Sequence, residues 1–189
     1  MAREKDKNNQ KHVAQALGLA VLAFTLSLAF NASFEELAQG ISFFFSIPLF
    51  LFVIALGIFT DAVGIACARA EERSLLSMAS RNVKGAKESL WFVKNASRMS
   101  SIFNDVLGDV SATLSGALAV AIIYRARPLF PAFNAVSVLW LTSLGVGFVS
   151  ALGVGGKALF KHVAMQRSEG IVVFLGRIRR FYLRAFRRK

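Results

Sequence analysis

Three aspartates lie where the sequence changes between polar and apolar residues, and their carboxylates suggest metal chemistry. Asp61 follows the charge-free run 40–60, whereas Asp105 and Asp109 precede the charge-free run 110–124. A carboxylate close to hydrocarbon costs several kcal/mol unless it is paired, hydrated or bound to a metal, so each of these residues is by default a functional candidate.

Neutral oxygen atoms recur at helical spacing beside these aspartates. Asp105 and Asp109 are one helical turn apart, and an amide and two hydroxyl groups fall on the neighbouring stripe of the same segment. Carboxylate, amide and hydroxyl oxygens are hard ligands that suit Mg²⁺ or Ca²⁺. We therefore predict a site for a hard divalent cation, either Mg²⁺ or Ca²⁺. Its predicted ligands are Thr60, Asp61, Asn104, Asp105, Asp109, Ser111 and Ser115.

A structural role for the same aspartates is the alternative. Asp105 would cap the N-terminus of a helix that starts there, since a short carboxylate accepts hydrogen bonds from the first amides. The other two aspartates would pair with the arginines of the segment 67–101, among them Arg69, Arg73 and Arg98. The sequence leaves both interpretations open.

The composition indicates the environment in which these residues act. Of 189 residues, 55% are hydrophobic, 18 are Phe, and the mean hydropathy is +0.53, which is typical of a membrane protein. Four long charge-free runs, 13–34, 40–60, 110–124 and 131–156, approach the roughly 20 residues that a membrane helix needs. We predict an all-α polytopic membrane protein with about four transmembrane helices. A cleaved signal peptide is the alternative for the first run, although its length favours a retained anchor.

The distribution of Lys and Arg predicts the topology. Residues 1–12 carry four basic residues, the segment 67–101 carries seven basic against three acidic residues, and the tail from 157 carries ten against one. Positive charge marks the cytoplasmic side of a membrane. We therefore expect a multi-pass protein of the cell membrane, with both termini and the segment 67–101 in the cytoplasm and a short outer loop at 31–40.

The C-terminal tail, "IVVFLGRIRRFYLRAFRRK", has the pattern of an amphipathic helix. Its apolar face holds Phe174, Ile178, Phe181 and Ala185, and its basic face holds Arg177, Arg180, Arg184 and Arg187. Such a helix is expected to lie on the membrane, where anionic lipids attract its guanidinium groups. Topology accounts for most of the +12 net charge, so nucleic-acid binding is the less favoured interpretation.

Other patterns concern packing rather than chemistry. The segment 67–101 predicts two short amphipathic helices on the cytoplasmic side, broken near "NVKG". Gly147, Ala151 and Gly155 repeat every fourth residue, which favours close helix contact and predicts a homodimer. No phosphate-binding loop, nucleophile elbow or HExxH pattern is present, and Cys67 is the only cysteine, so we predict no enzyme activity.

The run 57–119, from "GIFTDAVGIACARAEE" through "GAK" to "SIFNDVLGDVSATLSGALA", resembles the transmembrane domain of the CNNM/CorC magnesium transporter family. Thr60 and Asp61 stand where that family has a Ser-Gly-Ser-Glu type stretch, and Asn104 and Asp105 stand where it has paired asparagines. "DAVGIA" offers no counterpart of the family's glutamate. The family's CBS nucleotide-sensing domains also have no counterpart in these residues.

The resemblance implies a divalent-cation transporter, or its cation-binding membrane core, for Mg²⁺ or a similar ion such as Co²⁺. It also implies a homodimer. On this basis residues 1–40 form the N-terminus, first membrane helix and outer loop, 41–157 form the transporter-like core, and 158–189 form the basic juxtamembrane helix. A non-transporting membrane scaffold or regulatory subunit, with its aspartates paired to arginines, is the alternative function.

Overall fold

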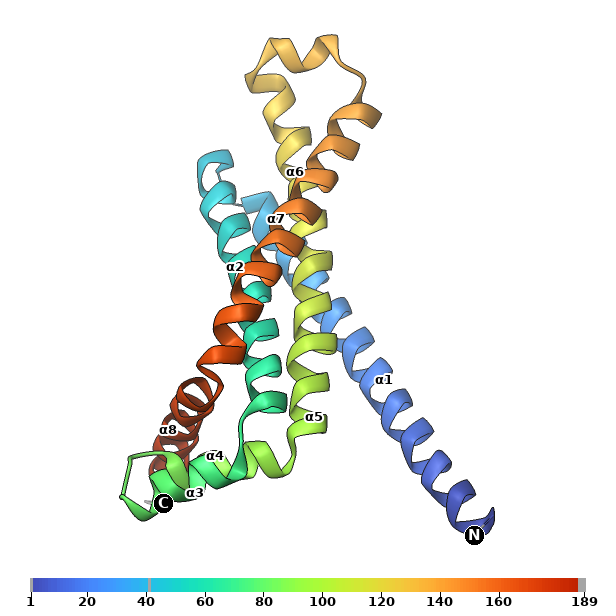
Figure 1. Ribbon diagram of the computed structural model, residues 1–189. Helices are drawn as coiled ribbons and strands as arrows, with labels where there is room; N and C mark the ends of the chain where they lie inside the picture. Colours follow the sequence, from blue (N-terminus) through green and yellow to red (C-terminus); the bar gives the residue numbers. More distant parts are fainter. Residues whose placement is uncertain (1, 41, 187–189) are drawn as a thin grey trace. The chain divides into compact units, whose positions relative to one another are not determined.

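The computed structural model describes residues 2–40 and 42–186, and for residues 2–12, 31, 34–40 and 186 it describes only the helical path. All regular secondary structure in these ranges is helical (Figure 1). The elements are α1 (Ala2–Gly40), α2 (Phe43–Arg69), α3 (Glu72–Ser80), α4 (Ala86–Lys94), α5 (Ala96–Ser100), the π-helix η1 (Ser101–Gly108), α6 (Asp109–Leu129), the 3₁₀ helix η2 (Pro131–Ala135), α7 (Val138–Gln166) and α8 (Ser168–Phe186).

Four stretches of helix are long and apolar enough to cross a membrane, which confirms the predicted number. They are Val13–Phe30, Phe43–Arg69, Ala96–Leu129 and Val138–Gln166. The lengths of the last three exceed the roughly 20 residues that a bilayer core requires. The chain is therefore consistent with a multi-pass membrane protein.

The helices extend beyond the bounds that the charge-free runs predict. The segment 31–40, predicted to be the outer loop, is helical, because α1 continues to Gly40. The second span does not close at Asp61, since small and apolar residues carry α2 on to Arg69. At 131 the chain instead forms η2, with Pro131 in its first turn, and α7 begins only at Val138.

The chain divides into two compact units. The first unit comprises Met1–Gly57 and Asp109–Gly153, and the second comprises Ile58–Gly108 and Val154–Lys189. Each unit draws on two separate parts of the sequence, so each is held together by contacts between distant residues. The predicted division at 40 and 157 describes the order of segments along the chain and not these two units.

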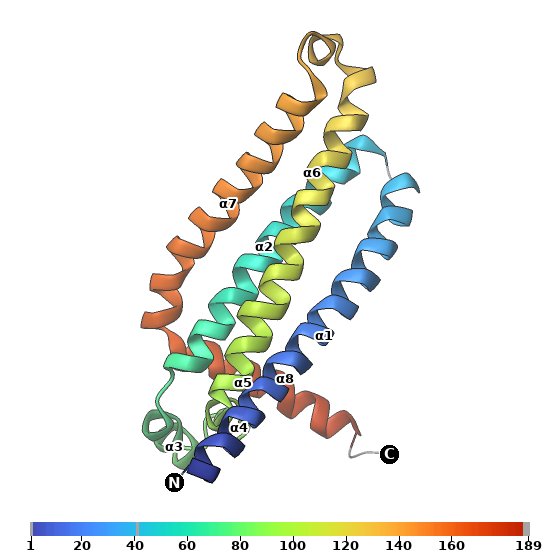
Figure 2. The ribbon, with the colours of Figure 1, turned by 90° about the vertical axis from the view of Figure 1, so that its right-hand side faces the viewer.

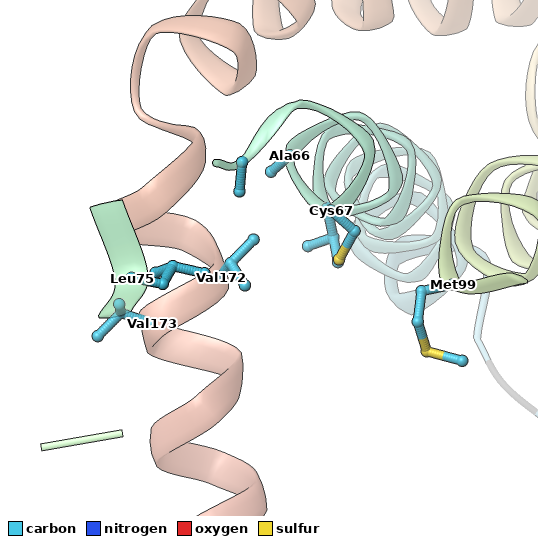
Figure 3. Close-up of a cluster of buried hydrophobic side chains, with 8 residues drawn as sticks. Ala66, Cys67, Leu75, Met99, Val172 and Val173 are labelled. Atoms are coloured by element: carbon cyan, nitrogen blue, oxygen red, sulfur yellow. The ribbon is translucent and has the colours of Figure 1, made fainter. Parts of the chain in front are cut away.

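The second unit has a core in which α3, α4 and α8 pack together (Figure 1). Leu75 of α3 is fully buried, as is Val172 of α8 beside it (Figure 3). Ala66 and Cys67 of α2 and Met99 of α5 belong to the same cluster. The charged segment between the two spans is therefore a folded part of the protein with its own hydrophobic interior.

Two glycines allow α4 and α8 to approach closely. Gly85 precedes α4 with φ 93°, a left-handed conformation that glycine adopts without strain. A Cβ added at Gly176 of α8 would collide with the carbonyl oxygen of Gly85 and would lie 2.9 Å from the Ser89 backbone nitrogen. The backbone of α8 therefore contacts the start of α4 and Gly85, the last residue of the "NVKG" stretch that separates α3 from α4.

The first unit buries fewer side chains. Its cluster consists of Val53 of α2 with Val110, Leu114 and Leu118 of α6, and Leu26 of α1 lies against it. Figure 2 shows α1 running alongside α6. None of the residues in Val13–Phe30 is buried, so most of the apolar surface of this stretch is left uncovered by the protein.

Candidate functional site

An ion pair lies within the apolar helices of the second unit. The ammonium nitrogen of Lys157 on α7 is 3.7 Å from Oδ1 of Asp61 on α2. The side chains are only 30% and 17% exposed, respectively. A charge at such a position is costly unless it has a partner, and each of these two groups provides one for the other. Asp61 of α2 thus has an oppositely charged partner on another candidate span, α7.

The helix that faces this pair changes its geometry locally. Residues 101–108 form the π-helix η1 between α5 and α6, so the chain is helical but has a wider turn over this stretch. π-helical turns are rare and are frequent at functional sites, because they redirect side chains and backbone groups without ending the helix. The segment contains Asn104, which the sequence singles out as a ligand.

Asn104 and Gly108 both face the ion-pair side of η1. A Cβ added at Gly64 of α2 would collide with the amide oxygen of Asn104, so the amide lies directly on the Gly64 backbone. A Cβ added at Gly108 would be 3.5 Å from the ammonium nitrogen of Lys157. Asp61 and Gly64 are about one turn apart on α2. The carboxylate, the ammonium and the amide therefore belong to one small contact region of α2, η1 and α7.

The amide oxygen of Asn104 is buried and has no hydrogen-bond partner among the described residues. Leaving such an acceptor unsatisfied costs about 1–3 kcal/mol, so a native protein normally supplies a partner. The region thus contains one carboxylate and one unsatisfied amide oxygen, both of them hard ligands. A cation or the hydrogen atoms of its bound water would satisfy the amide oxygen.

The other predicted ligands differ from Asp61 and Asn104 in their exposure and in their partners. Thr60 is buried on α2, one residue before Asp61, whereas the Asp105 side chain is exposed on η1. Asp105 lies inside a continuous helical stretch that begins at Ala96, so the expectation that it caps a helix is wrong. In the part of the chain that the structure describes, neither Asp105 nor Asp109 forms an ion pair with an arginine of 67–101.

Three predicted ligands belong to α6 in the first unit. Asp109 is exposed at the start of α6, and Ser111 and Ser115 are buried further along it. The hydroxyl group of Ser115 donates a hydrogen bond to the carbonyl oxygen of Ser111 at 2.8 Å. Across all described residues, no group of three or more His, Cys, Asp or Glu side chains is placed to hold a metal ion. The region around Asp61 therefore has one carboxylate rather than a carboxylate cluster.

Sequence reasoning did not identify Lys157 as the partner of Asp61. The available signal was its place as the first charge after the run 131–156, which puts it at the end of an apolar stretch just as Asp61 is. The arginines predicted as partners, Arg69, Arg73 and Arg98, lie in the segment 67–101 and are exposed. Because α2 and α7 both continue past their charge-free runs, the pairing forms inside the helices.

The small residues predicted for packing lie on α7, and the basic residues predicted to face lipid lie on α8 where they are described. A Cβ added at Gly147 or Gly155 would meet nothing within 4 Å, and Ala151 is exposed, so this face of α7 is open in the single chain. On α8, Nε of Arg177 donates to the carbonyl oxygen of Lys84 at 3.2 Å, and Arg180 pairs with Glu88. Arg184 is exposed, and Arg187 lies outside the described residues.

No protein-family model, curated protein or solved structure matches the chain.

Proposed function

We propose that the chain is the membrane core of a divalent-cation transporter, with Mg²⁺ as the favoured ion. Asp61 supplies the charged ligand and Asn104 supplies a neutral one, while Lys157 provides the positive charge when no ion is bound. The observation that carries the proposal is the buried, unsatisfied amide oxygen of Asn104 in the same contact region as the Asp61–Lys157 pair.

The donor set suits an ion that keeps part of its water shell. Mg²⁺ loses water reluctantly and is commonly bound through one or two carboxylates plus retained water molecules. Thr60, Asp105, Asp109, Ser111 and Ser115, which the sequence predicts as ligands of the same site, stay predictions that this donor set does not require. Lys157 must move away from Asp61 when a dication arrives, because the two positive charges would repel each other across a few ångströms.

The setting of this function follows the sequence-based expectations. We propose that the protein lies in the cell membrane with both termini in the cytoplasm. We also propose that it forms a homodimer, as its resemblance to the CNNM/CorC membrane domain implies. The excess of Lys and Arg in 67–101 and after 157 supports that orientation. The open small-residue face of α7 supports the dimer.

A test of ion binding compares the thermal unfolding of purified full-length variants with and without Mg²⁺. A ligand that binds only the folded state raises the melting temperature by mass action. We expect Mg²⁺ to stabilise the native chain and to lose that effect in Asp61→Asn and Asn104→Ala. Glu71→Gln, which neutralises an exposed carboxylate of the same unit, should retain the full shift.

Transport is measured separately with a Mg²⁺-sensitive dye inside proteoliposomes. Flux by the native protein and loss of flux in Asp61→Asn would support the transporter. A Mg²⁺ shift without flux would reduce the function to cation binding. If the shift survives in Asp61→Asn, Asp105→Asn and Asp109→Asn alike, the cation site is wrong.

A non-transporting membrane scaffold is the second candidate, and the Asp61–Lys157 pair itself favours it. A carboxylate that already has an ammonium partner at 3.7 Å needs no metal ion to remain in an apolar region. In that case the pair fixes the register of α2 against α7. Thermal unfolding would then be independent of Mg²⁺ in every variant.

A further inference from the structure

Helix α8 has two apolar faces, of which only one packs against the protein. Val172, Val173 and Gly176 are buried on the inner face, where α8 meets α3 and α4. On the outer face, Phe174 and Ile178 are each 52% exposed and Phe181 is 77% exposed. These three residues are spaced by one helical turn, so they form a continuous stripe, called here the outer stripe.

The arginines of α8 divide between these faces. The guanidinium of Arg179 lies over the ring of Trp91 at 4.4 Å, and Arg180 is 3.8 Å from a carboxylate oxygen of Glu88. Both contacts attach α8 to α4. Arg177 and Arg184 are exposed, and because they are seven residues apart they share one edge of the outer stripe. Nε of Arg177 also donates to the carbonyl oxygen of Lys84, so this edge of the stripe borders the turn before α4.

An aromatic and aliphatic stripe with arginines along its edge is typical of a helix that lies in the boundary between lipid head groups and acyl chains. The positive edge favours anionic lipids over neutral ones. A second copy of α8 fits this surface poorly, because it would place arginines opposite arginines. Glu169 is the only acidic residue of α8, and it lies at the start of the helix, away from Phe181.

We propose that the outer stripe of α8 docks into the interface of a bilayer that contains anionic lipids. Phe174, Ile178 and Phe181 enter the acyl boundary, and Arg177 and Arg184 contact the lipid phosphates. The inner face remains on α4, held there by Arg179 and Arg180. This surface is separate from the cation site, and its test does not depend on ion binding.

The test places an environment-sensitive fluorophore on the outer stripe of the full-length protein. Phe181→Cys in a Cys67→Ala background is labelled and reconstituted in nanodiscs of phosphatidylcholine, with or without phosphatidylglycerol. We expect a blue-shifted emission and quenching by doxyl-labelled lipid when phosphatidylglycerol is present. Arg177→Gln with Arg184→Gln should lower the ratio of docked to undocked α8 about thirtyfold, since each arginine near an anionic surface contributes about 1 kcal/mol.

Lys87→Cys, labelled in the same background, is the matched control, because Lys87 is exposed on α4 and outside the outer stripe. Equal quenching at positions 87 and 181 would overturn the assignment of the docking face. Quenching that is independent of phosphatidylglycerol would overturn the role of anionic lipid. A label that stays unquenched by lipid, or is shielded only at high protein concentration in detergent, would overturn membrane docking. Ile178→Cys provides a second labelling position if Phe181→Cys fails to fold.

Discussion

The two units of this chain differ in how much of their own surface they cover. The second unit, Ile58–Gly108 with Val154–Lys189, contains a buried cluster and the ion pairs Lys94–Glu72, Lys157–Asp61 and Arg180–Glu88. The first unit, Met1–Gly57 with Asp109–Gly153, contains a smaller cluster. No residue of Val13–Phe30 in the first unit is buried.

This difference separates two sources of stability. Helices in a bilayer gain little from burying apolar side chains against one another, because lipid tails are as apolar as leucine. The first unit therefore depends on lipid, or on another subunit, to cover its helices. The second unit has an interior of its own, so it can hold side chains in fixed positions. The second unit contains the Asp61–Lys157 ion pair and, beside it, the amide oxygen of Asn104, which has no hydrogen-bond partner among the described residues.

The largest expected effect compares one core leucine from each unit. Leu75 is fully buried in the second unit, and Leu114 is 5% exposed in the first. We expect Leu75→Ala to lower the free energy of unfolding by about 3 kcal/mol, because a cavity remains among fixed neighbours. Leu114→Ala should cost about 1 kcal/mol, since detergent or lipid can fill the space. Denaturant unfolding of the purified protein in detergent measures both losses.

Leu76→Ala is the control for this comparison. Leu76 adjoins Leu75 on α3 but is 50% exposed, so its removal should change the free energy of unfolding by less than about 0.5 kcal/mol. If Leu75→Ala and Leu114→Ala cost the same, the contrast between a self-covered and a lipid-covered unit is wrong.

A smaller effect is expected from the ion pair. Lys157→Met leaves the Asp61 carboxylate without its partner, and we expect a loss of about 2 kcal/mol, less than for a fully buried pair because both groups are partly exposed. Asp61→Asn in the Lys157→Met background should recover most of this loss, which a double-mutant cycle measures. Millimolar Mg²⁺ should stabilise Lys157→Met more than the native protein, because the dication no longer competes with the ammonium.

The outcomes of that cycle separate the two proposed functions. Recovery by Asp61→Asn without any added effect of Mg²⁺ on Lys157→Met would favour the scaffold. Additive losses in the double variant would mean that the two side chains do not interact, and would remove the pair from both proposals.

The sequence predicts the coarse fold well because membrane spans depend on local composition. Four charge-free runs indicated four apolar helices, and all four are present. Their ends were less predictable, since a single carboxylate such as Asp61 does not end a helix that has small, apolar residues beyond it. The partner of Asp61 depends on which helices of the fold meet, and spacing along the chain carries no such information.

The candidate site shows a further limit of spacing arguments. The predicted stripes assume regular α-helical geometry through residues 104–115, whereas the chain is π-helical up to Gly108. The wider turn leaves the Asp105 side chain exposed and places the Asn104 amide on Gly64. Asn104 was thus identified by its residue type and chain position. That its amide oxygen lacks a hydrogen-bond partner depends on the packing around it, which the sequence does not indicate.

The smallest effect on the folded chain is expected on the open face of α7, where lipid or a second copy must supply the neighbours. Gly147→Leu with Ala151→Leu meets no atom of the same chain near position 147, so the free energy of unfolding of the monomer should change little. If this face forms the predicted dimer, the bulk prevents close approach, and the dissociation constant in detergent should rise about tenfold. Gly145→Leu is the contrasting control, because a side chain there collides with Ile123 and should destabilise the monomer instead. Analytical ultracentrifugation of the three proteins distinguishes these effects, and an unchanged dimer in the double variant would assign this face of α7 to lipid.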